Sequence, residues 1–192
     1  MKKLKLSTLL LAFLVLSGSA LAQTVTFQGK SVHLYRTNMT VGKIAPNIRL
    51  VTPTLGTDVI GSINHKTQVI ASIVSLDTPV CNTETIALNK IAKKFHNVSF
   101  YIVSKDLPFR QEKFLSNNNI KNIQLLSSFR NNKFGKRFGT LITDTQLKGL
   151  EARSLYVIGK NGKIAYKRIS PEIAHAPDYK RLSNFLADYV KK

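Results

Sequence analysis

Two mostly apolar segments stand out along the chain, and an amphipathic segment lies between them. Residues 68–75 and 98–104 are apolar at most positions, which is typical of strands buried on both faces of a sheet. Residues 82–95 place apolar side chains on one face at helical spacing, namely Ala87, Leu88, Ile91, Ala92 and Phe95. The polar residues are expected elsewhere on this helix, among them Glu84, Asn89, Lys90, Lys93 and Lys94. This order predicts a βαβ unit in a parallel, well-covered sheet.

The remaining patterns complete one α/β domain. Alternating residues around a turn at residues 28–31 predict a β-hairpin over residues 24–36. The Asn161-Gly162 pair predicts the tight turn of a second hairpin. Its strands are expected at 153–158 and 163–169, with further strands at 48–51, 58–60 and 123–126 and helices at 107–117, 131–138 and 178–190. The expected fold is a central mixed sheet flanked by helices, with the hairpin at its N-terminal end.

The first residues have the pattern of an export signal. Three lysines precede an apolar run at residues 6–16, and small residues follow at 19–22. We therefore predict a signal peptide over residues 1–22, cleaved after Ala22, and a mature domain over residues 23–192. The expected location is a bacterial periplasm, and an uncleaved membrane anchor is the alternative. The absence of a cysteine at the cleavage site argues against a lipoprotein.

The chain is strongly basic, with 29 Lys and Arg, 10 Asp and Glu and a formal charge of +19. Removal of the three leader lysines would leave +16. Such a charge favours weak contact with anionic surfaces, although a solvated basic surface is the ordinary explanation. Nucleic-acid binding is not expected, because the sequence has no zinc motif, helix-turn-helix pattern or aromatic-rich RNA-binding signature.

The only cysteine lies where the first apolar segment gives way to the predicted helix. Asp77, Thr78 and Pro79 are typical of a helix start, so Cys81 is expected in the first turn. A helix N-terminus favours negative charge, and a thiolate there is a nucleophile. Cys81 could equally be an intermolecular disulfide partner or a buried, unreactive side chain.

Other candidate chemistry is weaker. The four histidines are scattered without metal-ligand spacing and are interpreted as surface or packing residues: His33, His65, His96 and His175. Asp77 is interpreted as a helix-capping carboxylate rather than a catalytic acid. The sequence has no phosphate loop, nucleophilic-serine elbow or Cys-x-x-Cys pair, so no cofactor and no metal are expected.

Five short elements, taken together, resemble one known family. They are Asp-Thr-x-Val-Cys at 77–81, Lys-Asp-Leu-Pro-Phe at 105–109, Ser-Phe-Arg-Asn at 128–131, Leu-Lys-Gly-Leu-Glu-Ala-Arg at 147–153 and Ala-Pro-Asp-Tyr at 176–179. From about Thr24 to the last predicted helix, the chain resembles the thiol peroxidase family of peroxiredoxins. This resemblance implies a thioredoxin-like fold and a homodimer.

The resemblance also implies roles for three residues. Cys81 would be the peroxidatic nucleophile, Thr78 would place its hydroxyl against the sulfur and the peroxide, and Arg153 would hold its guanidinium beside the thiolate. The simpler alternatives are that Thr78 only caps the helix and that Arg153 is one more surface cation.

The chain departs from the family pattern at two positions. Val74 stands where the family has a proline, which puts the shape of the cysteine pocket in question. Leu115 follows Phe114 where the family has its resolving cysteine, so the intramolecular disulfide cannot form. We therefore expect a one-cysteine peroxidase for hydrogen peroxide or small alkyl hydroperoxides. Its reductant would be a thiol-disulfide protein, a small thiol or a second copy of the chain.

Two other functions remain open from the sequence. The two departures and the basic charge are compatible with a peroxiredoxin-fold protein that has lost turnover. Such a protein would be a binding or redox-sensing module of the cell envelope. A disulfide oxidoreductase is a weaker alternative, because its usual pair of cysteines is missing.

Overall fold

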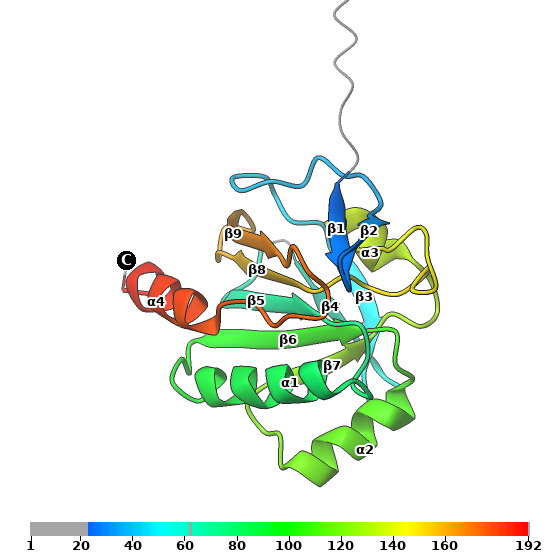
Figure 1. Cartoon of the computed structure of the whole chain (residues 1–192). Helices are drawn as coiled ribbons and strands as arrows, with labels where there is room; N and C mark the ends of the chain where they lie inside the picture. Colours follow the sequence, from blue (N-terminus) through cyan, green and yellow to red (C-terminus); the bar gives the residue numbers. More distant parts are fainter. Residues whose placement is uncertain (1–22, 62, 192) are drawn as a thin grey trace, which may run out of the picture.

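A seven-stranded mixed sheet forms the centre of the protein (Figure 1), seen in a computed structural model that describes residues 23–61 and 63–191. The predicted signal peptide, residues 1–22, lies outside the described residues. In order across the sheet, the strands are β4 (Thr57–Ile60), β3 (Ile48–Val51), β7 (Gln124–Ser127), β6 (Val98–Ser104), β5 (Thr67–Ser72), β8 (Ser154–Ile158) and β9 (Ile164–Ile169). The predicted central mixed sheet is confirmed. Within the described ranges, no helix is both long and apolar enough to cross a membrane.

The predicted βαβ unit lies at the middle of the sheet. β5 and β6 pair in parallel, and α1 (Pro79–Ala92) connects them. All six residues of β5 are buried, which explains why the segment is so apolar. β5 ends at Ser72 rather than at Ser75 as predicted, since the chain leaves the sheet there to reach the start of α1.

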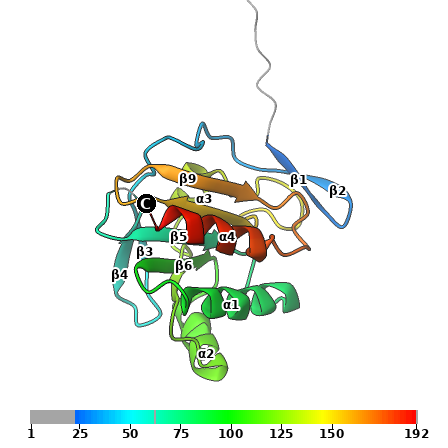
Figure 2. The same cartoon turned by 90° about the vertical axis from the view of Figure 1, so that its left-hand side faces the viewer.

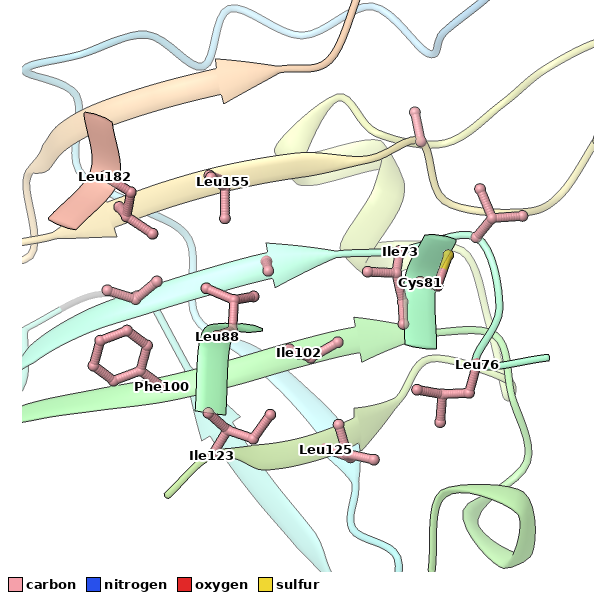
Figure 3. Packing of buried hydrophobic residues seen from close by; sticks show 14 of the residues in the cluster. Ile73, Leu76, Cys81, Leu88, Phe100, Ile102, Ile123, Leu125, Leu155 and Leu182 are labelled. Atoms are coloured by element: carbon pink, nitrogen blue, oxygen red, sulfur yellow. The ribbon is translucent and has the colours of Figure 1, made fainter. Parts of the chain in front are cut away.

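Helices cover both faces of the sheet. α1 and α4 (Tyr179–Tyr189) lie on one face and α3 (Lys133–Phe138) on the other, while α2 (Pro108–Asn118) packs beside β7 (Figures 1 and 2). The core under α1 and α4 includes Leu88, Leu155 and Leu182 (Figure 3). Cys81 belongs to this same cluster, so the sequence places its only thiol inside the main core.

The core on the α3 face is separate and more aromatic. Phe134 and Phe138 stack with their ring centroids 4.8 Å apart, and Tyr156 meets Phe138 edge-on at 5.1 Å. The Tyr156 hydroxyl donates to the Phe138 carbonyl at 2.5 Å, which satisfies its polar end. Aromatic packing and the Tyr156 hydroxyl bond therefore hold the short helix α3 against the sheet.

The N-terminal hairpin stands apart from the central sheet. β1 (Thr24–Phe27) and β2 (Lys30–His33) pair antiparallel, as predicted. Their turn is tighter than the predicted four residues, because Gln28 and Gly29 alone take positive φ values of 52° and 76°. The hairpin thus brings Phe27 toward the segment that follows β9, where Thr26 pairs with Glu172.

Candidate active site

A short loop after β5 delivers the cysteine to the start of α1. Asp106 holds this loop: its carboxylate accepts from Ser75 Oγ at 2.7 Å and from the Leu76 amide at 2.8 Å. Ser104 at the end of β6 donates to the same carboxylate at 2.8 Å. The loop position is therefore set by the neighbouring parallel strand, whose end lies at the same edge of the sheet.

Thr78, not Asp77, caps α1. The Thr78 hydroxyl oxygen accepts from the Cys81 amide at 3.4 Å and donates its own hydrogen to the Ser75 carbonyl at 3.1 Å. The prediction that Asp77 is the capping carboxylate is wrong, because Asp77 turns outward and accepts from Arg110 Nε at 2.7 Å. Either side chain could cap a helix, and the extended backbone of Thr78 decides between them.

Cys81 is fully buried in the first turn of α1, and Arg153 lies against it. Arg153 Nη2 is 3.3 Å from Cys81 Sγ, and Nε donates to the Ile173 carbonyl at 3.1 Å. Arg153 is itself only 2% exposed, so the alternative that it is a surface cation is wrong. It stands directly before β8, the antiparallel neighbour of β5, and this pairing brings it to the cysteine across 72 residues of chain.

Glu84 completes the cluster and is the residue that sequence reasoning missed. It was expected away from the buried face of the helix, yet it is 1% exposed and its carboxylate pairs with Arg153 Nη1. Glu84 lies three positions after Cys81, which is the spacing that puts two side chains on the same helical face. A glutamate at this spacing from the only cysteine was the available signal. The second oxygen, Oε1, has no hydrogen-bond partner among the described residues.

Tyr179 reaches the same cluster from α4. Its hydroxyl is buried without a hydrogen-bond partner in the described part of the chain. Burial raises the pKa of Tyr179, the Arg153 guanidinium opposes this rise, and Cys81 adds to it. The predicted apolar face of the last helix is confirmed, since Leu182 and Leu186 are buried in the core. The first residue of this face, Tyr179, brings its hydroxyl near Arg153.

A small pocket of about 250 Å³ opens beside the cluster. Thr78 and Arg153 are its polar members, and its apolar members are Phe27, Val74, Val80, Leu147, Ile173 and Ala174. Val74, which replaces the proline of the family pattern, is 7% exposed and forms part of this wall. The surface of this pocket is almost entirely apolar, and two hydrogen-bonding side chains stand in its wall.

Glu172 fixes one wall of the pocket. Its carboxylate accepts from Thr26 Oγ1 at 2.8 Å and from the amides of Gln28, Gly29 and Ala174 at 3.1, 3.3 and 2.9 Å. Burial acts against ionisation, but these donors outweigh it and lower the pKa of Glu172 to about 2. The hairpin is thereby tied to the segment whose Ile173 carbonyl holds Arg153.

The other predicted site features lie away from the cysteine. Leu115, at the family's resolving position, is a half-buried side chain packed against the core. All four histidines are exposed, and His33 Nδ1 pairs with Asp144 at 2.5 Å. Among the described residues, no three His, Cys, Asp or Glu side chains gather as metal ligands would.

The fold and this site define a class. A buried cysteine lies in the first turn of a helix, beside an arginine that stands directly before an antiparallel strand. The family model described as Redoxin matches residues 40–183. The chain is 38% identical over 170 residues to the thiol peroxidase of Aquifex aeolicus, covering 88% of this chain and 100% of that protein. It is 40% identical over 161 residues to the thiol peroxidase of Campylobacter jejuni, covering 84% and 91%.

Solved structures agree with these matches. A peroxiredoxin-like protein from Aquifex aeolicus superposes with a TM-score of 0.84 at 38% identity, covering 87% of this chain and 97% of that one. The thiol peroxidase from Chromobacterium violaceum, at 18% identity and a TM-score of 0.78, shares the fold. The chain belongs to the thiol peroxidase family of peroxiredoxins, with the thioredoxin-like fold that the sequence resemblance implied.

Proposed function

We propose that the protein is a thiol-dependent peroxidase that works through Cys81 alone. The observation that carries this proposal is the 3.3 Å contact between Arg153 Nη2 and Cys81 Sγ inside a fully buried cluster. A guanidinium is a permanent cation, so it stabilises the thiolate and the charge that develops on the leaving oxygen. The related thiol peroxidases support the same activity.

In the reaction, the Cys81 thiolate attacks one peroxide oxygen. An S–O bond forms while the O–O bond breaks, and the leaving oxygen departs as water or an alcohol after gaining a proton. Sulfur is oxidised to the sulfenic acid, and the peroxide is reduced. Arg153 and Thr78 both line the pocket beside the cysteine cluster. We assign Thr78 to hydrogen-bond the peroxide there and Arg153 to stabilise the transition state.

Hydrogen peroxide or small alkyl hydroperoxides are the proposed oxidants. The pocket of about 250 Å³ has space for a small molecule, and its apolar wall suits an alkyl group. We assign its two polar side chains, Thr78 and Arg153, to bind the peroxide oxygens.

An external thiol completes the proposed cycle, because the chain has no second cysteine. One thiol condenses with the sulfenic acid to a mixed disulfide and water, and a second thiol releases Cys81 as a disulfide forms between the two reductant sulfurs. A thiol-disulfide protein supplies both thiols, two molecules of a small thiol supply one each, and a second copy of the chain supplies only the first. The predicted signal peptide supports a periplasmic location, which N-terminal sequencing of the protein from a periplasmic fraction tests.

We also propose a homodimer, as the family resemblance implies. Exposed apolar side chains support this proposal: Leu107 is 52% exposed, Phe109 66% and Phe129 38%. Sedimentation velocity tests it. A dimer that dissociates in Phe109→Glu is the expected result, and a wild-type monomer at working concentration contradicts it.

The decisive experiment is a stopped time course with stoichiometric hydrogen peroxide, a sulfenic-acid trap and intact-mass detection. Rapid trapping at Cys81 is expected, with its loss in Cys81→Ser and strong slowing in Arg153→Ala and Thr78→Val. Arg181→Ala is the matched control, since Arg181 is exposed on α4. Oxidation of the wild type no faster than a free cysteine would overturn the proposed function.

The second candidate is a binding or redox-sensing module of the cell envelope. The formal charge of +19 and the leucine at the resolving position favour it. It predicts salt-sensitive binding to vesicles of anionic lipid that Cys81→Ser retains. This binding separates the two candidates, because the peroxidase requires the Cys81 thiol and binding to anionic lipid does not.

A further inference from the structure

The sheet opens at one place away from the cysteine. β3 and β7 pair at one position, Val51 with Ser127, and then diverge. The space between β3 and the segment after β7 is a pocket of about 360 Å³. This volume lies within the range of small-molecule sites in proteins.

The charge in this pocket has one sign. Arg49 from β3, Arg130 from the loop after β7 and Lys133 at the start of α3 line it. No Asp or Glu is among its described lining residues, whose other polar members are Asn47, Thr57, Ser127, Ser128 and Asn131. Three cations around one cavity repel one another, and an anion between them would offset that repulsion.

These cations are not neutralised elsewhere. Within the part of the chain that the structure describes, neither the Arg130 guanidinium nor the Lys133 ammonium has a hydrogen bond or ion pair, and Arg130 lies over the Phe129 ring at 5.6 Å. Arg49 makes one long bond, from Nη1 to Thr57 Oγ1 at 3.3 Å. Most of their donor capacity therefore remains available to a ligand.

The wall of the pocket is held in place from behind. Lys105 Nζ donates to the Ser128 and Asn131 carbonyls at 2.9 and 2.7 Å and to Asn132 Oδ1 at 2.8 Å. Glu151, buried under this loop, accepts from Ser128 Oγ at 3.3 Å. A site whose wall is already ordered loses less entropy on binding.

We propose that this pocket binds a small oxyanion, a phosphate or carboxylate group, held by Arg49, Arg130 and Lys133. Arginine presents a planar fork to such groups and lysine a point charge. The pocket is separate from the cysteine cluster, since neither Cys81 nor Arg153 lines it.

The test is isothermal titration of the protein with sodium phosphate and, separately, with sodium succinate at constant ionic strength. Saturable binding of either, one per chain, is expected at about millimolar affinity or tighter. Amide resonances of residues 47–51 and 127–133 should shift in NMR spectra. The two titrations distinguish a phosphate-bearing from a carboxylate-bearing ligand.

A pair of charge-matched variants localises the effect. Arg49→Gln with Lys133→Gln should weaken binding by at least about tenfold. Lys90→Gln with Lys180→Gln removes the same charge from exposed positions on α1 and α4 and should leave binding unchanged. Absence of saturable binding by the wild type, or equal weakening in both variants, would overturn the proposal. Trapping at Cys81 is unaffected in either case, so failure here is distinct from failure of the peroxidase.

Discussion

Glu84→Gln tests how the active-site cluster is held together. The substitution keeps the size of the side chain and one acceptor oxygen but removes the charge that faces Arg153. Removing one partner of a buried ion pair typically lowers stability by about 3–5 kcal/mol. The amide oxygen retains a hydrogen bond to the guanidinium, which recovers part of that loss. We therefore expect the free energy of unfolding to fall by about 1–3 kcal/mol.

The effect on chemistry follows from the geometry of Arg153. Its guanidinium is held at three points, by Glu84, the Ile173 carbonyl and Cys81. Weakening one of these contacts lets the group shift from the sulfur, and misplacement of about 1 Å can cost 10²-fold in rate. With two contacts left, we expect about tenfold slower oxidation of Cys81 by peroxide, and a larger loss in Glu84→Ala.

The assay combines thermal unfolding by circular dichroism with the second-order rate of Cys81 oxidation, measured well below the melting temperature. Glu112→Gln, on the exposed side of α2, is the matched control and should equal the wild type in both. A folded Glu84→Gln protein with wild-type rate and stability would refute the reasoning, because the buried carboxylate would then contribute nothing to the position of Arg153.

Three further substitutions test particular contacts. Glu172 has a pKa lowered to about 2, so its contribution to stability is complete above pH 4.5 and is lost as pH falls toward 2. Unfolding midpoints across this range should therefore depend less on pH in Glu172→Gln than in the wild type. An unchanged pH dependence in this variant would contradict the prediction. Tyr179→Phe removes a buried hydroxyl that has no partner among the described residues. Denaturant unfolding should show unchanged stability or a gain of about 1 kcal/mol, with Tyr189→Phe as the control. A loss of stability of more than about 1 kcal/mol would count against this prediction. Gly135→Ala would place a Cβ 2.4 Å from Glu151 Oε2, which is too close for two non-bonded atoms. This crowding should lower stability by about 1–3 kcal/mol. Wild-type stability of the variant in a melting experiment would contradict the prediction.

The central part of the fold could be predicted from local patterns. β5 and β6 are buried on both faces, so they appear as apolar runs, and the change to helical spacing between them marks the site of Cys81. The end of β5 and the choice of Thr78 as cap could not be predicted, because both depend on contacts with Asp106 and on backbone angles that no sequence period reports.

Glu84 shows a different limit. An amphipathic pattern assigns every charged residue to the solvent side, since an isolated buried charge is very costly. The rule fails where a partner arrives from elsewhere, and Arg153 lies 69 residues away in the sequence. The same holds for the pocket beside β3, whose cations come together only through the antiparallel pairing of β3 with β7.

Arg153 is where these long-range contacts converge. Arg153 stands directly before β8 and contacts Cys81 and Glu84 of α1. Its Nε also donates to the Ile173 carbonyl in the segment after β9. Glu172 secures that segment to the hairpin, so four stretches of chain determine the position of one guanidinium. No second thiol in the chain can form a disulfide with an oxidised Cys81, so its reduction depends on another molecule. The sulfur is enclosed, and the pocket of about 250 Å³ beside it is lined by Thr78 and Arg153 but not by Cys81. Because the Cys81 side chain is fully buried, a peroxide or thiol that reaches the sulfur needs a local opening of the residues around it.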